Sequence, residues 1–166
     1  MAVIGILALQ GGFSCHAQQL DRCGVTWRLI KTPQQLQGLS GLIMPGGESS
    51  ALLKLMAPID QWQSAVADFI RRGGVLFATC AGLILSADTV CPKQASLSLL
   101  PVTVERNAYG RQRESFIAQG QCHEPALSDQ PIEMVMIRAP RITQCGEGVR
   151  VLVSYQGEPM MVQSGQ

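Results

Sequence analysis

A cysteine with small neighbours ends a short apolar run in the segment Ala78-Thr79-Cys80-Ala81-Gly82. Small residues two positions before and after a nucleophile meet the steric demand of a nucleophile elbow, which is a strained strand-to-helix turn. A thiol there would face the unpaired amides that open a helix expected over Ala81–Ala87, and these favour the thiolate. The pattern therefore predicts Cys80 as a nucleophile. The alternative is a small hydrophobe in a core, where free cysteines are common.

A glycine pair lies at the end of another apolar run, in the segment Pro45-Gly46-Gly47, and Glu48-Ser49-Ser50 follows at an expected helix start. Two glycines let backbone amides approach a bound group closely, so this loop could hold an oxyanion that develops on a substrate carbonyl. The same residues are also typical of an ordinary helix start. The functional interpretation therefore depends on the pairing with Cys80.

Arginines in the second half could bind a carboxylate. Arg106, Arg111 and Arg113 lie close together in the sequence, and Arg138 ends a strand-like run. A guanidinium holds a carboxylate through two parallel hydrogen bonds, so Arg106 or Arg138 could anchor the acid group of an amino acid. The alternative for each is a solvated surface arginine.

The first half has the pattern of a doubly wound α/β fold. Helical spacing occurs over 15–23 and over 49–72, where Pro58 should separate two helices and Asp60 could cap the second. Four short apolar runs read as buried strands, namely Ala2–Leu9, Val25–Ile30, Leu39–Met44 and Val75–Ala78. This alternation predicts a mostly parallel sheet with helices on both faces. Because reactive groups gather at the carboxyl ends of such strands, Cys80 and the glycine loop should lie on one edge.

The second half contains strand-like runs with little helical spacing, in "LLPVTVERNAYGRQ", "EMVMIRAP", "VRVLVSY" and "PMMVQ". These runs predict a meandering, partly antiparallel extension of the main sheet. With 166 residues and no evident linker, the chain is expected to form a single domain over 1–166.

Composition excludes several classes of protein. A net charge of +1 is too small for binding a phosphate backbone, so no nucleic-acid partner is expected. No apolar run reaches the ~20 residues of a membrane span, and the N-terminus does not resemble a signal peptide, which predicts a cytoplasmic protein. Two histidines and six cysteines without a C-x-x-C pair argue against a metal site and for reduced thiols. The cysteines other than Cys80 have no comparable setting.

Five motifs in order, "GILALQGG", "GLIMPGGESS", "TCAGLIL", "RNAYGRQRESF" and "IRAP", resemble those of the glutaminase subunits of pyridoxal 5′-phosphate synthase. These proteins are class I glutamine amidotransferases with a flavodoxin-like fold. The resemblance implies hydrolysis of L-glutamine to L-glutamate and ammonia, without a cofactor. It also implies a hetero-oligomer in which the ammonia passes to a synthase subunit that builds pyridoxal 5′-phosphate, or vitamin B6.

The resemblance assigns roles by position. It implies that Cys80 is the nucleophile that forms a glutamyl thioester, and that Gln10, Gly11 and His16 belong to the oxyanion hole or the synthase interface. The substrate-contacting positions that it implies are Gly47, Glu48, Ser49, Arg106, Ile137 and Arg138.

One family feature is missing from the sequence. The family's general base lies in a His-x-Glu segment after the "IRAP" region, and no such segment follows here, so the domain is expected to lack its C-terminal end. His123 and Glu124 precede "IRAP" in a loop-like stretch, so they should not replace the histidine and glutamate of the missing His-x-Glu segment. We therefore expect little or no glutaminase turnover. The alternatives are another cysteine hydrolase on a similar fold and a non-catalytic binding subunit.

Overall fold

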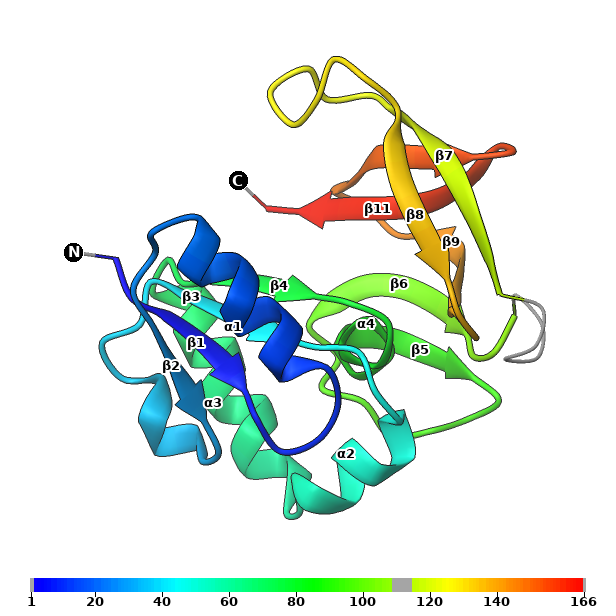
Figure 1. The fold of residues 1–166 in the computed structure, drawn as a ribbon. Helices are drawn as coiled ribbons and strands as arrows, with labels where there is room; N and C mark the ends of the chain where they lie inside the picture. Colours follow the sequence, from blue (N-terminus) through cyan, green and yellow to red (C-terminus); the bar gives the residue numbers. More distant parts are fainter. Residues whose placement is uncertain (1, 109–114, 166) are drawn as a thin grey trace. The chain divides into compact units, whose positions relative to one another are not determined.

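The computed structural model describes residues 2–108 and 115–165, and it divides the chain into two compact units (Figure 1). The first unit contains Met1–Ser86 and Ala95–Leu99, and the second contains Ala87–Gln94 and Leu100–Gln166. The expectation of a single domain over 1–166 stays a prediction.

The first unit is built on a parallel four-stranded sheet with the strand order β2-β1-β3-β4. The strands are β1 (Ile4–Leu7), β2 (Trp27–Ile30), β3 (Gly41–Met44) and β4 (Val75–Ala78). The helices are α1 (Phe13–Arg22), η1 (Pro33–Leu36, a 3-10 helix), α2 (Ser49–Leu55), α3 (Ile59–Arg71) and α4 (Ala81–Ser86). The predicted α/β fold with a parallel sheet is confirmed, and all four predicted strands are present.

Helices cover both faces of this sheet. Ile6 and Ile43 pack with Ala17 of α1, whereas Leu7, the neighbour of Ile6, packs in the cluster that contains Val66 of α3. Successive side chains of a strand point to opposite faces, so α1 and α3 lie on opposite sides of the sheet (Figure 1). The central strands β1 and β3 are wholly apolar and almost entirely buried, which reflects this double coverage. The outer strands β2 and β4 have exposed residues, among them Arg28 and Val75, so the expectation that all four strands are buried is wrong for these two.

The predicted break between α2 and α3 is confirmed at Pro58, but the predicted cap at Asp60 is wrong. Pro58 itself is the N-cap residue of α3, with extended backbone angles and no side-chain hydrogen bond, and Asp60 lies in the first helical turn. A carboxylate in that turn still interacts favourably with the helix dipole. The predicted helix end is confirmed at Gly73, which follows α3 and has φ of 89°.

The described residues of the second unit form two sheets. One has the order β11-β10-β7-β8 and is antiparallel, and the other has the order β5-β6-β9, with β5 and β6 parallel. The strands are β5 (Ala87–Cys91), β6 (Leu100–Glu105), β7 (Phe116–Cys122), β8 (Ile132–Met136), β9 (Arg141–Cys145), β10 (Val149–Tyr155) and β11 (Glu158–Ser164).

Two sequence-based expectations, one about the second half and one about the helix after Cys80, are wrong in detail. The antiparallel strands do not extend the main sheet, because among the described residues they pair with β5, β7 and β9, which the sequence did not reveal. The helix expected over Ala81–Ala87 ends at Ser86, since Ala87 is already the first residue of β5. Within the described ranges, no helix has the length and apolar character needed to cross a membrane.

Candidate functional site

Cys80 lies in a strained turn directly after β4. Its φ is 48°, a left-handed conformation that is uncommon for a residue other than glycine. Backbone hydrogen bonds hold both sides of the turn, because Thr79 N donates to Met44 O (3.0 Å) and Gly82 N donates to Thr79 O (2.8 Å). The thiol is free and partly exposed. This is the backbone geometry of a nucleophile elbow, which the small neighbours of Cys80 predict.

The small residue at position 82 is required by close packing against β3. A Cβ atom on Gly82 would lie 2.1 Å from the carbonyl oxygen of Met44, which is a backbone atom that cannot move independently. The neighbouring Ala81 is completely buried. The turn therefore sits directly on the end of β3, and this contact fixes the position of Cys80.

The glycine loop after β3 lies beside the thiol. A Cβ atom built on Gly46 would lie 3.2 Å from Cys80 Cβ and 3.9 Å from Cys80 Sγ. The prediction that the loop and Cys80 share the carboxyl edge of the parallel sheet is confirmed by this approach. The loop backbone is thus close enough for its amides to face a group bound to the sulfur.

A third segment, the loop between β1 and α1, contacts the glycine loop. Gly12 N donates to Gly46 O (2.9 Å), and Gln10 Oε1 accepts a hydrogen bond from Glu48 N (3.0 Å). Gly11 has φ of 100°, and a Cβ atom there would lie 2.0 Å from Gly46 O. Only glycine tolerates both this backbone angle and this approach. Gln10 and Gly11 therefore belong to the same local structure as Cys80.

Glu48 and Ser49 connect the glycine loop to α2. The carboxylate of Glu48 caps that helix, accepting hydrogen bonds from Ser50 N (3.3 Å) and Ala51 N (2.8 Å). Ser49 is buried, with 3% of its surface exposed. The capping contacts fix the loop at its C-terminal end, as the hydrogen bonds of Gln10 and Gly12 fix its middle. Substrate contact by Gly47, Glu48 and Ser49 stays a prediction.

His16 of α1 contacts the cysteine turn at Thr79. Its Nε2 lies 3.5 Å from Thr79 Oγ1, and its ring meets the Phe77 ring edge-on, with 6.4 Å between centroids. Burial lowers the pKa of His16 below its usual value of 6.5, so the imidazole is neutral at pH 7. Only the family resemblance pointed to His16 in the sequence, and the contact with Thr79 spans 63 positions without a local signal.

The other predicted substrate contacts belong to the second unit. Arg106 follows β6, and its backbone N donates to Cys91 O (2.8 Å). Ile137, which is 49% exposed, and Arg138, which has φ of 47°, follow β8. Their predicted grouping with Cys80 around glutamine stays a prediction. Arg111 and Arg113 lie outside the described residues.

His123 and Glu124 have partners within the second unit. His123 Nε2 lies 2.7 Å from Ser154 Oγ, and Glu124 forms an ion pair with Arg150 at 3.0 Å. These contacts fit the expectation that the pair is structural. Within the described ranges, no group of three or more His, Cys, Asp and Glu residues is arranged to bind a metal ion.

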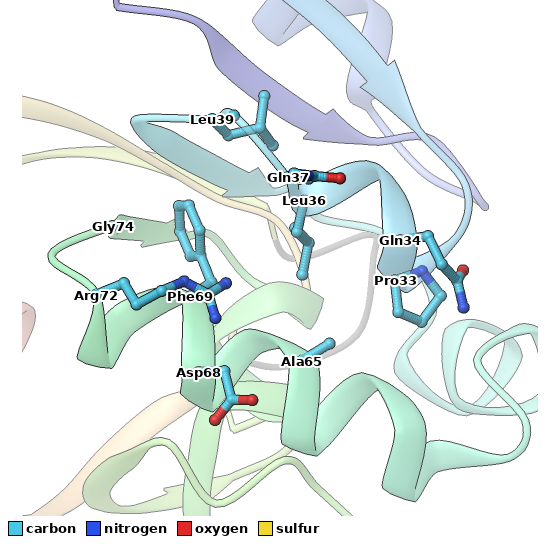
Figure 2. A pocket seen from close by; sticks show the side chains of 11 residues that line it. Pro33, Gln34, Leu36, Gln37, Leu39, Ala65, Asp68, Phe69, Arg72 and Gly74 are labelled. Carbon is cyan, nitrogen blue, oxygen red and sulfur yellow. The ribbon is translucent and has the colours of Figure 1, made fainter.

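A cavity of about 500 Å³ lies in the first unit between η1 and α3 (Figure 2). Its lining includes Leu36, Gln37, Asp68, Phe69 and Arg72 but neither a cysteine nor a histidine. It therefore offers neither a thiol nor an imidazole, and none of the residues around Cys80 lines it.

The parallel sheet and the elbow cysteine are features of the class of protein that the structural comparison identifies, the glutamine amidotransferases. A crystal structure of a glutamine amidotransferase matches with a TM-score of 0.87 and 38% identity, over 99% of this chain and 86% of that one. Another glutamine amidotransferase, from Thermotoga maritima, has a TM-score of 0.67 over 99% of this chain and 72% of that one. At 11% identity, this second match shows the fold alone.

The chain belongs to the SNO glutamine amidotransferase family, whose model matches residues 6–166. The pyridoxal 5′-phosphate synthase subunit PdxT of Solibacter usitatus is 44% identical over 170 residues, covering 100% of this chain and 88% of that protein. PdxT of Thermotoga maritima is 40% identical, covering 98% of this chain and 85% of that protein. The family membership confirms the resemblance and decides against an unrelated cysteine hydrolase.

Proposed function

We propose that this chain is the glutaminase subunit of a pyridoxal 5′-phosphate synthase. It hydrolyses L-glutamine to L-glutamate and ammonia, and the ammonia passes to a synthase subunit in a hetero-oligomer. The family membership and the PdxT relatives support this proposal. The observation that carries it is the strained turn at Cys80 with Gly46 beside its sulfur.

The reaction begins when Cys80 Sγ, as the thiolate, attacks the carbon of the glutamine carboxamide. The tetrahedral intermediate carries an oxyanion, which backbone amides of the Gly46-Gly47 loop stabilise with help from the Gln10-Gly11 segment. The C–N bond then breaks, the nitrogen takes up a proton from solvent, to which the thiol had lost its own, and leaves as ammonia, and a glutamyl thioester remains. Water hydrolyses the thioester to L-glutamate and restores the thiol.

The remaining predicted residues would bind the rest of the substrate. We assign Gly47, Glu48 and Ser49, with Arg106, Ile137 and Arg138, to glutamine binding. A guanidinium of Arg106 or Arg138 is suited to the α-carboxylate because it can donate two parallel hydrogen bonds. In this assignment the whole of 1–166 acts as one glutamine amidotransferase domain.

Proton transfer limits this mechanism in residues 1–166. The sequence has two histidines, of which His16 lies against Thr79 and His123 against Ser154. A general base typically contributes about 10²–10⁴-fold to the rate. A polypeptide of residues 1–166 alone is therefore expected to bind glutamine with weak or no turnover.

The experiment has two readouts on the same protein. A glutamine-mimicking chloroketone should label Cys80 before the other cysteines, and L-glutamine should protect it, whereas Cys80→Ala should lose the label and the matched Cys91→Ala should keep it. Ammonia release is then measured in the presence of the synthase. Labelling elsewhere, or no protection by glutamine, would reject the proposed site. Rapid ammonia release would reject the expectation of weak turnover.

We place the protein in the cytoplasm, with no nucleic-acid or membrane partner. The six cysteines are all free, as expected in a reducing compartment. The net charge of +1 fits a protein that binds an amino acid and a protein subunit.

A further inference from the structure

We propose that His16 is a positioning residue for the Cys80 thiol and acts through the hydroxyl of Thr79. The proposal rests on the proposed function, because it concerns how the same cysteine is held. Its geometric basis is the approach of His16 Nε2 to Thr79 Oγ1 at 3.5 Å.

Thr79 is the residue through which a neighbour can influence the elbow. Its backbone is fully engaged, with its N bonded to Met44 O and its O bonded to Gly82 N. Its hydroxyl is directed to α1, where it meets His16. Because Cys80 follows immediately with φ of 48°, any rotation of the Thr79 backbone would displace the sulfur relative to Gly46. Holding the hydroxyl therefore limits the orientations of the thiol.

His16 is suited to this task because its own side chain is restrained. The imidazole and the Phe77 ring meet in a T-shaped arrangement. His16 also lies on α1, a helix that packs on the sheet through Ala17. Its neutral ring offers one nitrogen as donor and the other as acceptor, so it can pair with a hydroxyl in either direction. A charged side chain at this place would require stronger solvation.

The helix that carries His16, α1, begins next to the glycine loop beside the Cys80 sulfur. Gly12, directly before α1, donates its N–H to Gly46 O (2.9 Å). The β1–α1 segment thus contacts the glycine loop at one point and the cysteine turn at another. Through these two contacts it sets the spacing between the sulfur and the amides that would face the oxyanion.

The test measures the rate at which iodoacetamide modifies Cys80, by peptide mapping of the folded protein. Thr79→Val removes the hydroxyl but keeps the shape, and Thr79→Ser keeps the hydroxyl. His16→Ala removes the imidazole, and His123→Ala is the matched control that removes the chain's other histidine. A Thr79→Val/His16→Ala double variant completes a cycle, and thermal midpoints show which variants remain folded.

Thr79→Val and His16→Ala should each change the Cys80 rate by about three- to tenfold, the effect of losing one hydrogen bond. The double variant should show no more than the larger single effect, and Thr79→Ser should stay within about twofold of the parent. Parental rates in Thr79→Val, or effects that multiply in the double variant, would overturn the proposal. If His16→Ala does not fold, Thr79→Val against Thr79→Ser still decides the outcome.

Failure of this proposal is distinguishable from failure of the proposed function. Iodoacetamide needs no glutamine site, so the positioning effect is measured whether or not glutamine protects Cys80. Protection by glutamine with unchanged Thr79→Val rates would reject the positioning role alone. Absence of protection together with a rate changed about three- to tenfold in Thr79→Val would reject the proposed function alone.

Discussion

Gln10 Oε1 accepts a 3.0 Å hydrogen bond from the backbone N–H of Glu48, which lies 38 positions later in the chain. The bond joins the loop after β1 to the loop after β3, next to the backbone bond from Gly12 N to Gly46 O. A side chain thus orients the peptide that precedes the α2 cap. The conformation of the glycine loop beside Cys80 therefore depends on a residue from the first strand's end.

Replacing Gln10 should loosen this loop. Gln10→Leu keeps a side chain of similar size but removes the acceptor, so Glu48 N loses its partner and the loop amides become less ordered. We expect about three- to tenfold weaker protection of Cys80 by L-glutamine, measured from its labelling rate against glutamine concentration. Gln18→Leu, on an exposed position of α1, is the control and should protect normally. Equal protection in both variants would show that Gln10 does not contribute to glutamine binding.

The glycine at position 11 offers a matched test of close packing. Gly11 and Gly73 have similar φ values of 100° and 89°, but a Cβ on Gly11 would meet Gly46 O at 2.0 Å, whereas Gly73 has no atom within 4 Å. Both alanine variants incur the left-handed strain of about 1–2 kcal/mol. Gly11→Ala should lower the free energy of unfolding by a further ~1–3 kcal/mol, because the clash must be relieved.

Urea denaturation of both variants measures this difference. The strain common to both cancels, so the excess for Gly11→Ala reports the contact between the two loops. Equal losses would mean that the loops separate at little cost and that Gly46 is not held by the β1–α1 loop.

The parallel half of the fold was predictable because its strands are mostly apolar, and the two central strands completely so. Gly41–Met44, for example, is buried at every position, which leaves a continuous apolar run in the sequence. β5 and β9 carry polar, exposed residues in the middle of short strands, with the sequences ADTVC and RITQC. Such strands are defined by their pairing with β6, which is a tertiary interaction without a local sequence pattern.

The functional site likewise has one part that the sequence predicts and one part that it does not. The approach of Gly46 to Cys80 follows from a general rule, that the loops after parallel strands meet at one edge of the sheet. The contact of His16 with Thr79 follows no such rule, since it depends on where one helical residue falls over one strand. Residue spacing alone does not encode that register, so the pair became evident only in three dimensions.

His16 should make the stability of the protein depend on pH. Burial lowers its pKa in the folded state, so below the usual value of 6.5 the unfolded chain binds the proton more readily. This contribution to stability is present above pH 6.5 and is lost as the pH falls through the folded-state pKa. His16→Asn should therefore lose less stability than the parent between pH 7.5 and 5.5, measured by urea denaturation.

The other histidine provides the control for that measurement. His123→Asn removes an exposed imidazole that bonds to Ser154. It leaves His16 in place, so the contribution of His16 to the pH dependence should persist. A parental slope in His16→Asn would show that His16 does not titrate differently in the two states.

Cys145 should react more slowly than the exposed cysteines. Burial raises the pKa of its thiol above 9.0, because the charged thiolate loses solvation, whereas Cys15, Cys23 and Cys91 are exposed. The thiolate is the reactive form, so at pH 8 Cys145 should be modified by iodoacetamide after those three. Its modification rate should keep rising above pH 9, and unfolding in urea should abolish the difference.

Because the unfolded thiol ionises first, the stability contributed by the neutral thiol of Cys145 is lost as the pH rises through the folded-state pKa. Rapid modification of Cys145 in the folded protein at pH 8 would show that β9 opens to solvent and that its pairing with β6 is weak.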